Sequence, residues 1–354
     1  MNANELLSSL KNPRQTAKVA DLVYVNDHHL SILRKPHGRG FTYLMGKERV
    51  KENKTIDRIK SLVIPPNWKN VKIAKPENGH LQAVGRDDKN RKVYRYHDLW
   101  MKIRNETKFF KMAAFGNVLP ALRKQVEIDL AQPGMPRTKV LALVLKLMEE
   151  THVRVGNDYY ARRNKTYGLS TLRSKHVDIY KDKMKFNFIG KRGKEHNITI
   201  RNKRLIKLVN QCEEIPGWEL FKYYDQDGDK STIDSTMVNE YIQELSGNFF
   251  SAKDFRTWAA SKIFFETLKE LAPPEDEKEQ DKNLLHGFDA SAKALGNTRN
   301  VCRTYYVHPI LVEKYKDKTL YPYFEKADEL KDKPFFTATE QVVQELYGSY
   351  EIDL

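Results

Sequence analysis

Up to about residue 96 the hydrophobic and polar positions mostly alternate or are interrupted by turn residues, a pattern typical of short strands. The alternation is clearest in residues 80–87 (HLQAVGRD) and 92–97 (KVYRYH), and the GRDDKN sequence predicts a turn between them. One helix is expected in residues 55–66 (TIDRIKSLVIPP), where apolar residues recur at helical spacing and two prolines end the pattern. The N-terminal part is therefore predicted to be rich in β-structure.

From about Asp98 the period of the pattern becomes that of a helix. Residues 98–125 are predicted to be helical, and residues 137–153 (RTKVLALVLKLMEETHV) predict an amphipathic helix. Its apolar face would carry Val140, Val144, Leu147 and Met148. The change of period places a domain boundary near residue 105, which gives domains of residues 1–105 and 106–354.

A short sheet is expected to interrupt the helices, with strands in residues 169–180 (LSTLRSKHVDIY), 183–190 (KMKFNFIG) and 196–200 (HNITI). The KRGK sequence at residues 191–194 predicts a basic hairpin turn between the last two strands. Further helices are expected in residues 203–212, 235–245 and 252–271 and in a C-terminal set. The charged, proline-led segment 273–283 (PPEDEKEQDKN) predicts an exposed linker. The predicted fold class is α+β: a small β-rich N-terminal domain and a larger, mainly helical domain with a short three-stranded sheet.

Composition narrows the class of protein. The chain has 354 residues and is 40% hydrophobic, which is enough to bury a core and favours two domains. With 62 Lys and Arg against 47 Asp and Glu, the net charge is +15, so a nucleic acid is the favoured partner. No basic amphipathic anchor, signal-peptide core or membrane-spanning run is present, which predicts a cytoplasmic protein without a membrane partner. Cys212 and Cys302 fit no metal-ligand spacing.

Four segments carry residue types that suit attack on a phosphodiester: THVRVGNDYY with Arg154, FIGKRGK with Lys191, KDFRTW with Arg256, and NVCRTYYVHP with Tyr305 and Tyr306. Each residue has an ordinary alternative. Arg154 could pair with Glu149 or Glu150, Arg256 could lie on a solvated helix face, and hairpin lysines usually only face solvent. Taken together, three cations could neutralise charge on phosphate oxygens while a hydroxyl attacks phosphorus.

The proposed chemistry needs no added energy source. An ordinary lysine, with a pKa of about 10.4, is protonated at pH 7, so Lys191 could donate a proton to a leaving alkoxide. Lys253 shares a helix face with Arg256 and could assist. Attack by a phenol gives an ester whose leaving group has a pKa of about 10, which a returning alcohol can expel. Neither ATP, a metal nor another cofactor is therefore expected.

Two other patterns have simpler explanations. The sequence contains no GxxxxGK[ST] phosphate loop, and DQDGDK at residues 225–230 lacks the full spacing of a calcium loop and predicts a turn. The histidines do not form the pairs of a metallohydrolase, and His176 and His196 are expected to hydrogen-bond within the small sheet.

The chain resembles type IB DNA topoisomerases of the bacterial, poxvirus-like branch. The resemblance covers most of the chain and rests on the segments GRGFTYLMG, LVIPPNW, GHLQAVGRD, RKVYRYH, RVGNDYYARRNKTYGLSTLRSKHV, FIGKRGK, AKDFRTWAAS and ALGNTRNVCRTYYVHP, in that order. It implies two domains that close as a clamp round duplex DNA, and a monomer that relaxes supercoils through a 3′-phosphotyrosyl intermediate. The implied catalytic residues are Tyr306 as nucleophile, Arg154, Arg256 and Asn297 on the phosphate, Lys191 as general acid, and Lys253 in support.

The implied DNA contacts are Tyr94, Tyr96, Arg173 and Arg192. The chain also departs from the family pattern. Asn297 stands where poxvirus relatives have a histidine, although an amide can still donate to a phosphate oxygen. Arg192 and Arg299 also differ from common family residues, and Val93 replaces a glutamine that often reads bases, so sequence preference is expected to differ.

Two alternatives remain at this point. A tyrosine recombinase would share the chemistry, although KDFRTW lacks the His-x-x-Arg pattern of that class. A non-catalytic DNA-binding module would explain the charge without explaining the set of site residues.

Overall fold

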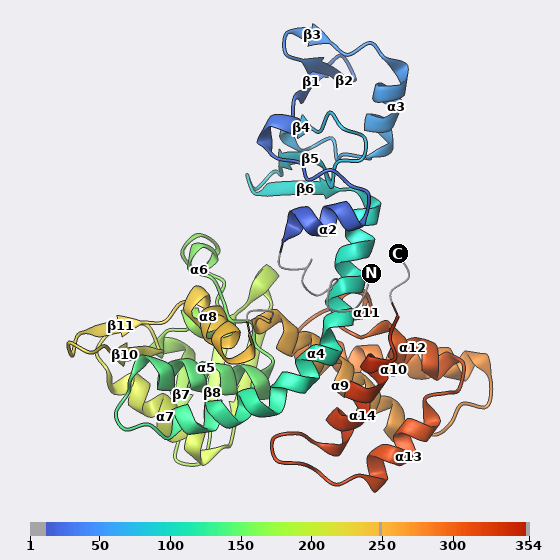
Figure 1. The fold of residues 1–354 in the computed structure, drawn as a ribbon. Helices are drawn as coiled ribbons and strands as arrows, with labels where there is room; N and C mark the ends of the chain where they lie inside the picture. Colours follow the sequence, from blue (N-terminus) through green and yellow to red (C-terminus); the bar gives the residue numbers. More distant parts are fainter. Residues whose placement is uncertain (1–11, 248–249, 352–354) are drawn as a thin grey trace. The chain divides into compact units, whose positions relative to one another are not determined.

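The computed structural model describes residues 12–247 and 250–351 (Figure 1). The chain forms two compact units, one made up mainly of residues before Met112 and the other of Met112–Tyr350. The division falls inside the long helix α4 (Asp98–Leu130). Among the described residues, no helix is long and apolar enough to cross a membrane.

The first unit is built on an antiparallel sheet with the strand order β3-β2-β1-β4-β5-β6. The strands are β1 (Ile32–His37), β2 (Gly40–Met45), β3 (Glu48–Arg49), β4 (Lys69–Ile73), β5 (Leu81–Arg86) and β6 (Lys92–Tyr96). The unit also contains α2 (Pro13–Val19), the short 3₁₀ helix η1 (Asp27–His29) and α3 (Asn53–Ser61). The two strands and the helix predicted for this part are confirmed, and the β-rich character with them.

Helix α3 closes the core of this unit. Ile59 of α3 is buried together with Ile32, Val71, Ile73 and Ala83 of the central strands. The β5–β6 hairpin pairs Val84 with Tyr94, which fixes the two tyrosines of β6 at alternate positions on one face of the strand.

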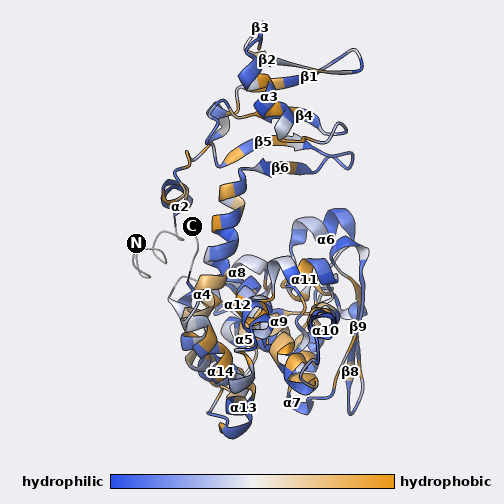
Figure 2. Cartoon of the chain, turned by 90° about the vertical axis from the view of Figure 1, so that its right-hand side faces the viewer, coloured by the Kyte–Doolittle hydropathy of each residue, from blue (hydrophilic) through white to orange (hydrophobic). Residues whose placement is uncertain are grey.

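The second unit is mainly helical. Its helices after α4 are α5 (Arg137–Thr151), α6 (Asp158–Asn164), α7 (Lys203–Glu214), α8 (Ser235–Ser246), α9 (Ala252–Glu270), α10 (Glu277–Leu295), α11 (Arg299–Tyr305), α12 (Pro309–Lys316), α13 (Tyr321–Glu329) and α14 (Ala338–Gly348). The small sheet β7-β8-β9 comprises β7 (Val177–Ile179), β8 (Met184–Ile189) and β9 (Glu195–Ile200). Hydrophobic positions run along α4, whereas α6 is almost entirely hydrophilic (Figure 2).

Helix α5 is confirmed, but the prediction of an amphipathic helix is wrong. Residues 139–145 are all buried, as are Leu147, Met148 and Thr151. The reason is that α7, α8, α9 and β10 (Lys222–Tyr224) all pack against it, so it lies at the centre of the core. Even Lys139 is accommodated, because its ammonium donates to the carbonyls of Gln132 and Gly134, at 2.8 and 2.9 Å.

The predicted linker at residues 273–283 is wrong over most of its length, because α10 begins at Glu277. Asp276 caps the helix by accepting a hydrogen bond from the backbone N–H of Glu279, at 2.7 Å. Acidic residues in the first turn favour the helix N-terminus, so the charge that suggested a linker supports a helix instead.

The small sheet is confirmed with one correction. The predicted strand 169–180 is mostly two short 3₁₀ helices, η2 (Leu169–Thr171) and η3 (Ser174–His176), and only Val177–Ile179 pairs with β8. The turn predicted at residues 225–230 joins β10 to β11 (Lys230–Thr232), a two-stranded hairpin that the sequence pattern did not reveal.

Candidate active site

The loop between α5 and α6 carries Arg154. The N–H groups of Leu169 and Ser170 donate to the carbonyls of Arg154 and Val155, at 2.9 and 2.7 Å. A Cβ on Gly168 would lie only 2.5 Å from the carbonyl oxygen of Arg154, so glycine is required there by the close approach of the two backbones. The backbone of Arg154 is therefore fixed by the 3₁₀ segment that follows Gly168.

The side chain of Arg154 points to Asn297. Its Nη2 donates to Oδ1 of Asn297 at 2.5 Å, which joins the loop to the segment after α10. Glu149 instead pairs with Arg123, at 2.9 Å. Among the described residues neither Glu149 nor Glu150 forms an ion pair with Arg154, so the alternative of an ordinary surface pair is wrong.

Arg256 lies on α9 and is only 3% exposed, so the alternative of a solvated helix face is wrong as well. Its two terminal nitrogens donate to the carbonyls of His152 and Leu295. Its Nε has no hydrogen-bond partner among the described residues. Burial, followed by the charge of Arg154, lowers the pKa of Arg256 to about 10, which still leaves it a cation at neutral pH.

Tyr306 follows α11 and lies beside Arg256. The guanidinium carbon of Arg256 is 5.4 Å from the centroid of the tyrosine ring. Burial opposes ionisation of the phenol, but the charge and hydrogen bond of Arg256, with the charges of Arg154 and Lys253, outweigh it and lower the pKa of Tyr306. Tyr305, by contrast, is 44% exposed, so the two neighbouring tyrosines occupy different environments.

A buried serine holds the turn that presents Tyr306. The hydroxyl of Ser261 donates to the carbonyl of Tyr306 at 3.2 Å and accepts from the N–H of His308 at 3.0 Å. Ser261 has no exposed surface. It therefore fixes the backbone on both sides of Val307, a role for which the sequence gives no signal.

Lys191 stands at the tip of the β8–β9 hairpin, in the short 3₁₀ turn η4 (Lys191–Gly193). Arg192 and Gly193 adopt left-handed backbone conformations, with φ of 66° and 78°, which turn the chain sharply after the lysine. Desolvation and, next, the charge of Arg154 lower the pKa of Lys191. The predicted basic hairpin is confirmed, and its lysine gives up a proton more readily than a free lysine does.

Asn297 and Lys253 complete the set of expected catalytic residues, and all six lie in the second unit. Asn297 follows Gly296, the left-handed C-cap of α10. Lys253 is exposed on the first turn of α9 and is close enough to influence the phenol of Tyr306. Among the described residues no carboxylate forms an ion pair with Arg154, Lys191, Lys253 or Arg256.

The expected DNA contacts are placed in both units. On β6 the rings of Tyr94 and Tyr96 stack with centroids 5.9 Å apart, and Tyr94 is 45% exposed. In the second unit the guanidinium of Arg173 lies 5.8 Å from the ring of Trp218, which is 73% exposed. Arg192 is exposed beside Lys191.

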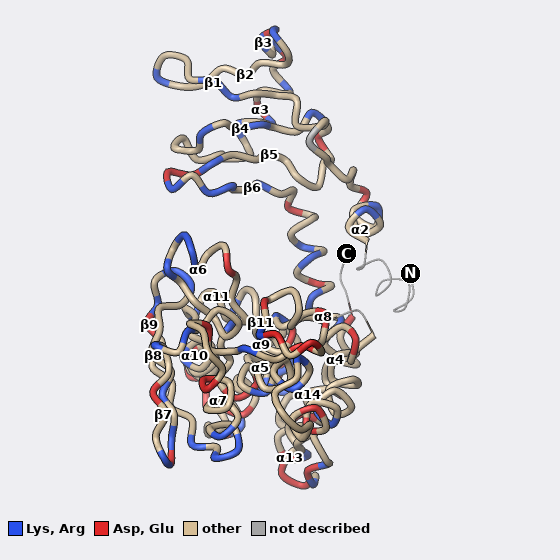
Figure 3. Tube along the Cα trace, turned by 90° about the vertical axis from the view of Figure 1, so that its left-hand side faces the viewer, with Lys and Arg blue, Asp and Glu red and all other residues tan. Residues whose placement is uncertain are grey.

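Helix α6 adds a surface that the sequence interpretation missed. Tyr159 and Tyr160 are 58% and 51% exposed, and Arg163 donates to the hydroxyl of Tyr159 at 2.5 Å. Arg162 and Arg163 make the last turn of this helix basic (Figure 3). Aromatic residues interleaved with arginines, as in DYYARR, are the sequence signal that could have indicated it.

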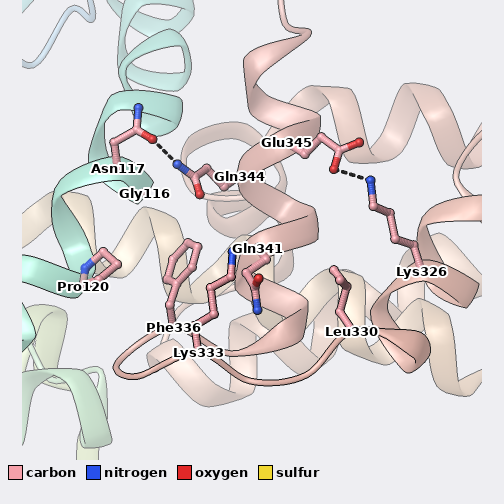
Figure 4. A pocket seen from close by; sticks show the side chains of 10 residues that line it. All are labelled: Gly116, Asn117, Pro120, Lys326, Leu330, Lys333, Phe336, Gln341, Gln344 and Glu345. Carbon is pink, nitrogen blue, oxygen red and sulfur yellow. Dashed lines mark hydrogen bonds and ion pairs between the residues drawn. The ribbon is translucent and has the colours of Figure 1, made fainter.

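A separate pocket of about 480 Å³ lies between α4, α13 and α14 (Figure 4). Its lining includes Asn117, Lys326, Phe336, Gln344 and Glu345, and none of the expected catalytic residues. Polar groups in it already pair with one another, as Lys326 does with Glu345 at 2.6 Å. The candidate chemistry therefore lies outside this pocket of the described part of the chain. Within that same part of the chain, no group of three or more His, Cys, Asp or Glu residues could hold a metal ion.

Known proteins resemble this chain over most of its length. Residues 99–333 match the family described as eukaryotic DNA topoisomerase I, catalytic core, and residues 40–87 match the bacterial DNA topoisomerase IB N-terminal domain. The chain is 35% identical over 303 residues to DNA topoisomerase 1B of Acanthamoeba polyphaga mimivirus, which covers 82% of this chain and 90% of that protein. It is 23% identical over 243 residues to DNA topoisomerase 1B of vaccinia virus (strain Copenhagen), covering 67% and 73% of the two chains. A catalytic-core match over most of the second unit, together with these relatives, means that the chain belongs to the type IB DNA topoisomerase family.

Proposed function

We propose that this chain relaxes supercoiled duplex DNA by cutting one strand, letting it rotate and resealing it. The phenolic oxygen of Tyr306 attacks phosphorus, and the bond between phosphorus and the 5′ oxygen breaks. The phenolic proton leaves to solvent, and the 5′ oxygen takes a proton from Lys191. The products are a 3′-phosphotyrosyl ester and a free 5′-hydroxyl.

The observation that carries this proposal is the buried guanidinium of Arg256 beside the Tyr306 ring. A cation there favours the phenolate, in agreement with the lowered pKa of Tyr306. The Nε of Arg256 has no hydrogen-bond partner among the described residues, so this guanidinium keeps one unused donor. Preorganised donors of this kind contribute most where charge builds up in the transition state.

The remaining cations have separate roles. Arg154 and Asn297, held together by their hydrogen bond, stabilise charge on the non-bridging oxygens. Lys191 acts as the general acid, which its lowered pKa favours. Lys253 supports the phenolate and the proton transfer through its positive charge.

Resealing reverses these steps. The 5′-hydroxyl attacks the phosphotyrosine, and the phenolate of Tyr306 departs as a better leaving group than an alkoxide, so the ester keeps the energy of the broken bond and no ATP is used. Tyr94, Tyr96, Arg173 and Arg192 contact the duplex, with the exposed aromatic residues of α6 as additional contacts. The enzyme acts as a monomer on DNA of the cytoplasmic nucleoid, and it uses no metal or other cofactor.

The direct test is relaxation of a supercoiled plasmid in EDTA without ATP. Wild type should relax the plasmid and leave a covalent protein–DNA adduct when denatured during turnover. Tyr306→Phe should bind DNA yet form no adduct, because only the hydroxyl is lost, whereas Tyr305→Phe should retain most of the activity. An active Tyr306→Phe beside an inactive Tyr305→Phe would show that the nucleophile is the preceding residue. Relaxation proportional to monomer concentration would separate this enzyme from a recombinase, which assembles several protomers.

A further inference from the structure

The imidazole of His196 lies between two glycines that belong to different parts of the site. A Cβ built on Gly190 would lie 2.6 Å from Nε2 of His196, and one built on Gly296 would lie 2.8 Å from its Cε1. Gly190 directly precedes Lys191, and Gly296 directly precedes Asn297. The ring therefore fills the space between the backbone that carries the proposed acid and the backbone that carries the phosphate-binding amide.

A third contact fixes the plane of this ring. His196 on β9 pairs across the hairpin with Phe188 on β8, and their rings stack with centroids 4.8 Å apart and planes within 6°. Phe188 is buried in the core. The hairpin therefore holds one face of the His196 ring through Phe188, and the ring contacts the end of α10 at Gly296.

On one side of His196, hydrogen bonds hold the end of α10 in place. The N–H groups of Gly296 and Asn297 donate to the carbonyls of Lys293 and Ala292, and Arg256 donates to the carbonyl of Leu295 at 2.9 Å. Residues 191–195 of the hairpin, by contrast, are all exposed. Without the ring, the hairpin tip would lose the contact that sets its distance from Asn297.

We propose that His196 is a positioning residue that holds the Lys191 hairpin tip against the Gly296–Asn297 turn and so places the Lys191 ammonium at the leaving oxygen. This role rests on the proposed function, in which Lys191 is the acid. His196 acts by shape, because among the described residues its imidazole makes no hydrogen bond, contrary to the expectation from sequence. Burial, followed by the charges of Arg154, Lys194 and Arg256, lowers the pKa of His196 to about 4, so the ring is neutral at pH 7 and adds no repulsion.

The test uses the full chain and a duplex that contains one cleavage site mapped with wild type. Single-turnover cleavage is measured with an ordinary 5′ oxygen and with sulfur at that bridging position, since a thiolate leaves without a proton. His196→Ala should slow cleavage of the oxygen substrate by roughly 10- to 100-fold, the scale of a misplaced reacting group, and sulfur should restore most of the rate. His196→Phe keeps a flat stacking ring and should recover most of the activity on oxygen. His286→Ala, at an exposed histidine of α10, is the matched control and should behave as wild type.

Gly190→Ala provides a second variant if His196→Ala does not fold. Its backbone, with φ −95° and ψ −166°, accepts alanine, so the effect of the new methyl group comes from displacing the His196 ring. It should reproduce the rate and the sulfur rescue of His196→Ala.

A double mutant decides the proposal. If His196 acts through Lys191, adding His196→Ala to Lys191→Ala should cost less than about 3-fold, because the group being positioned is already gone. Full additivity, or a wild-type rate for His196→Ala, would overturn the proposal. If sulfur does not rescue Lys191→Ala, the proposed role of Lys191 as general acid is wrong. The double mutant still tests separately whether His196 acts through Lys191.

Discussion

The guanidinium of Arg256 and the ring of Tyr306 form a contact of 5.4 Å in a part of the core from which water is largely excluded. Because this cation lowers the pKa of Tyr306, removing it should both slow cleavage and shift its pH dependence. Arg256→Ala should reduce the cleavage rate by about 10²–10³-fold and move the rise of rate with pH to higher pH. Single-turnover cleavage measured across pH checks both effects. A slower reaction with an unchanged pH dependence would show that Arg256 does not act by lowering the pKa of Tyr306.

The Lys191→Ala and Arg256→Ala variants should respond differently when the 5′ leaving oxygen is replaced by sulfur. Lys191→Ala should slow cleavage by roughly 10²–10⁴-fold, since a proton no longer reaches the 5′ oxygen. Sulfur at the bridging position should restore the rate of this variant and leave Arg256→Ala slow, because Arg256 acts on the phosphate rather than on the leaving atom. Equal rescue of both variants, or of neither, would remove Lys191 from the role of acid.

Ser261 should link stability to catalysis. Ser261→Ala leaves the carbonyl of Tyr306 and the N–H of His308 without their buried partner, which should lower the free energy of unfolding by about 1–3 kcal/mol. Cleavage by the folded fraction should also slow, because the turn that carries the nucleophile is loosened. Ser291→Ala is the matched control. Ser291 is equally buried and donates to Ala260 at 2.8 Å, so its loss should affect urea unfolding but not cleavage.

Three histidines should make stability depend on pH. In each of His152, His176 and His196, burial and then neighbouring positive charges lower the pKa from 6.5 to about 4. The unfolded chain therefore binds protons below pH 6.5 that the folded chain does not bind until about pH 4. The free energy of unfolding should fall as pH drops through this window and should not respond to these groups above it. Urea midpoints measured at constant ionic strength test this, and His196→Phe should show a shallower fall than wild type.

Local patterns in the sequence predicted the local parts of the structure. The hairpin at Lys191 follows from a basic turn between two alternating segments, and helix α5 follows from its apolar spacing. The burial of Arg256 could not be predicted in the same way, because the carbonyls that hold it come from His152 and Leu295, 104 and 39 residues away.

The same limit explains what the sequence interpretation missed. His196 is one of 10 histidines, and its meaning depends on two glycines that meet only after the hairpin folds onto α10. The charge and prolines of segment 273–283 favour a linker, whereas Asp276, as the N-cap, specifies the start of a helix.

The positive charges gathered at the site carry a consequence for how this enzyme can evolve. Burial, followed by the charge of Arg154, lowers the pKa of both Arg256 and Lys191, so part of each shift reflects repulsion among these cations before a phosphate arrives. Neutral residues of similar shape, such as methionine at Lys191, should thus make the DNA-free protein more resistant to heat while ending turnover. Selection for heat stability alone would therefore favour neutral residues at these positions and yield inactive variants. Only selection for DNA relaxation retains the mutually repelling cations.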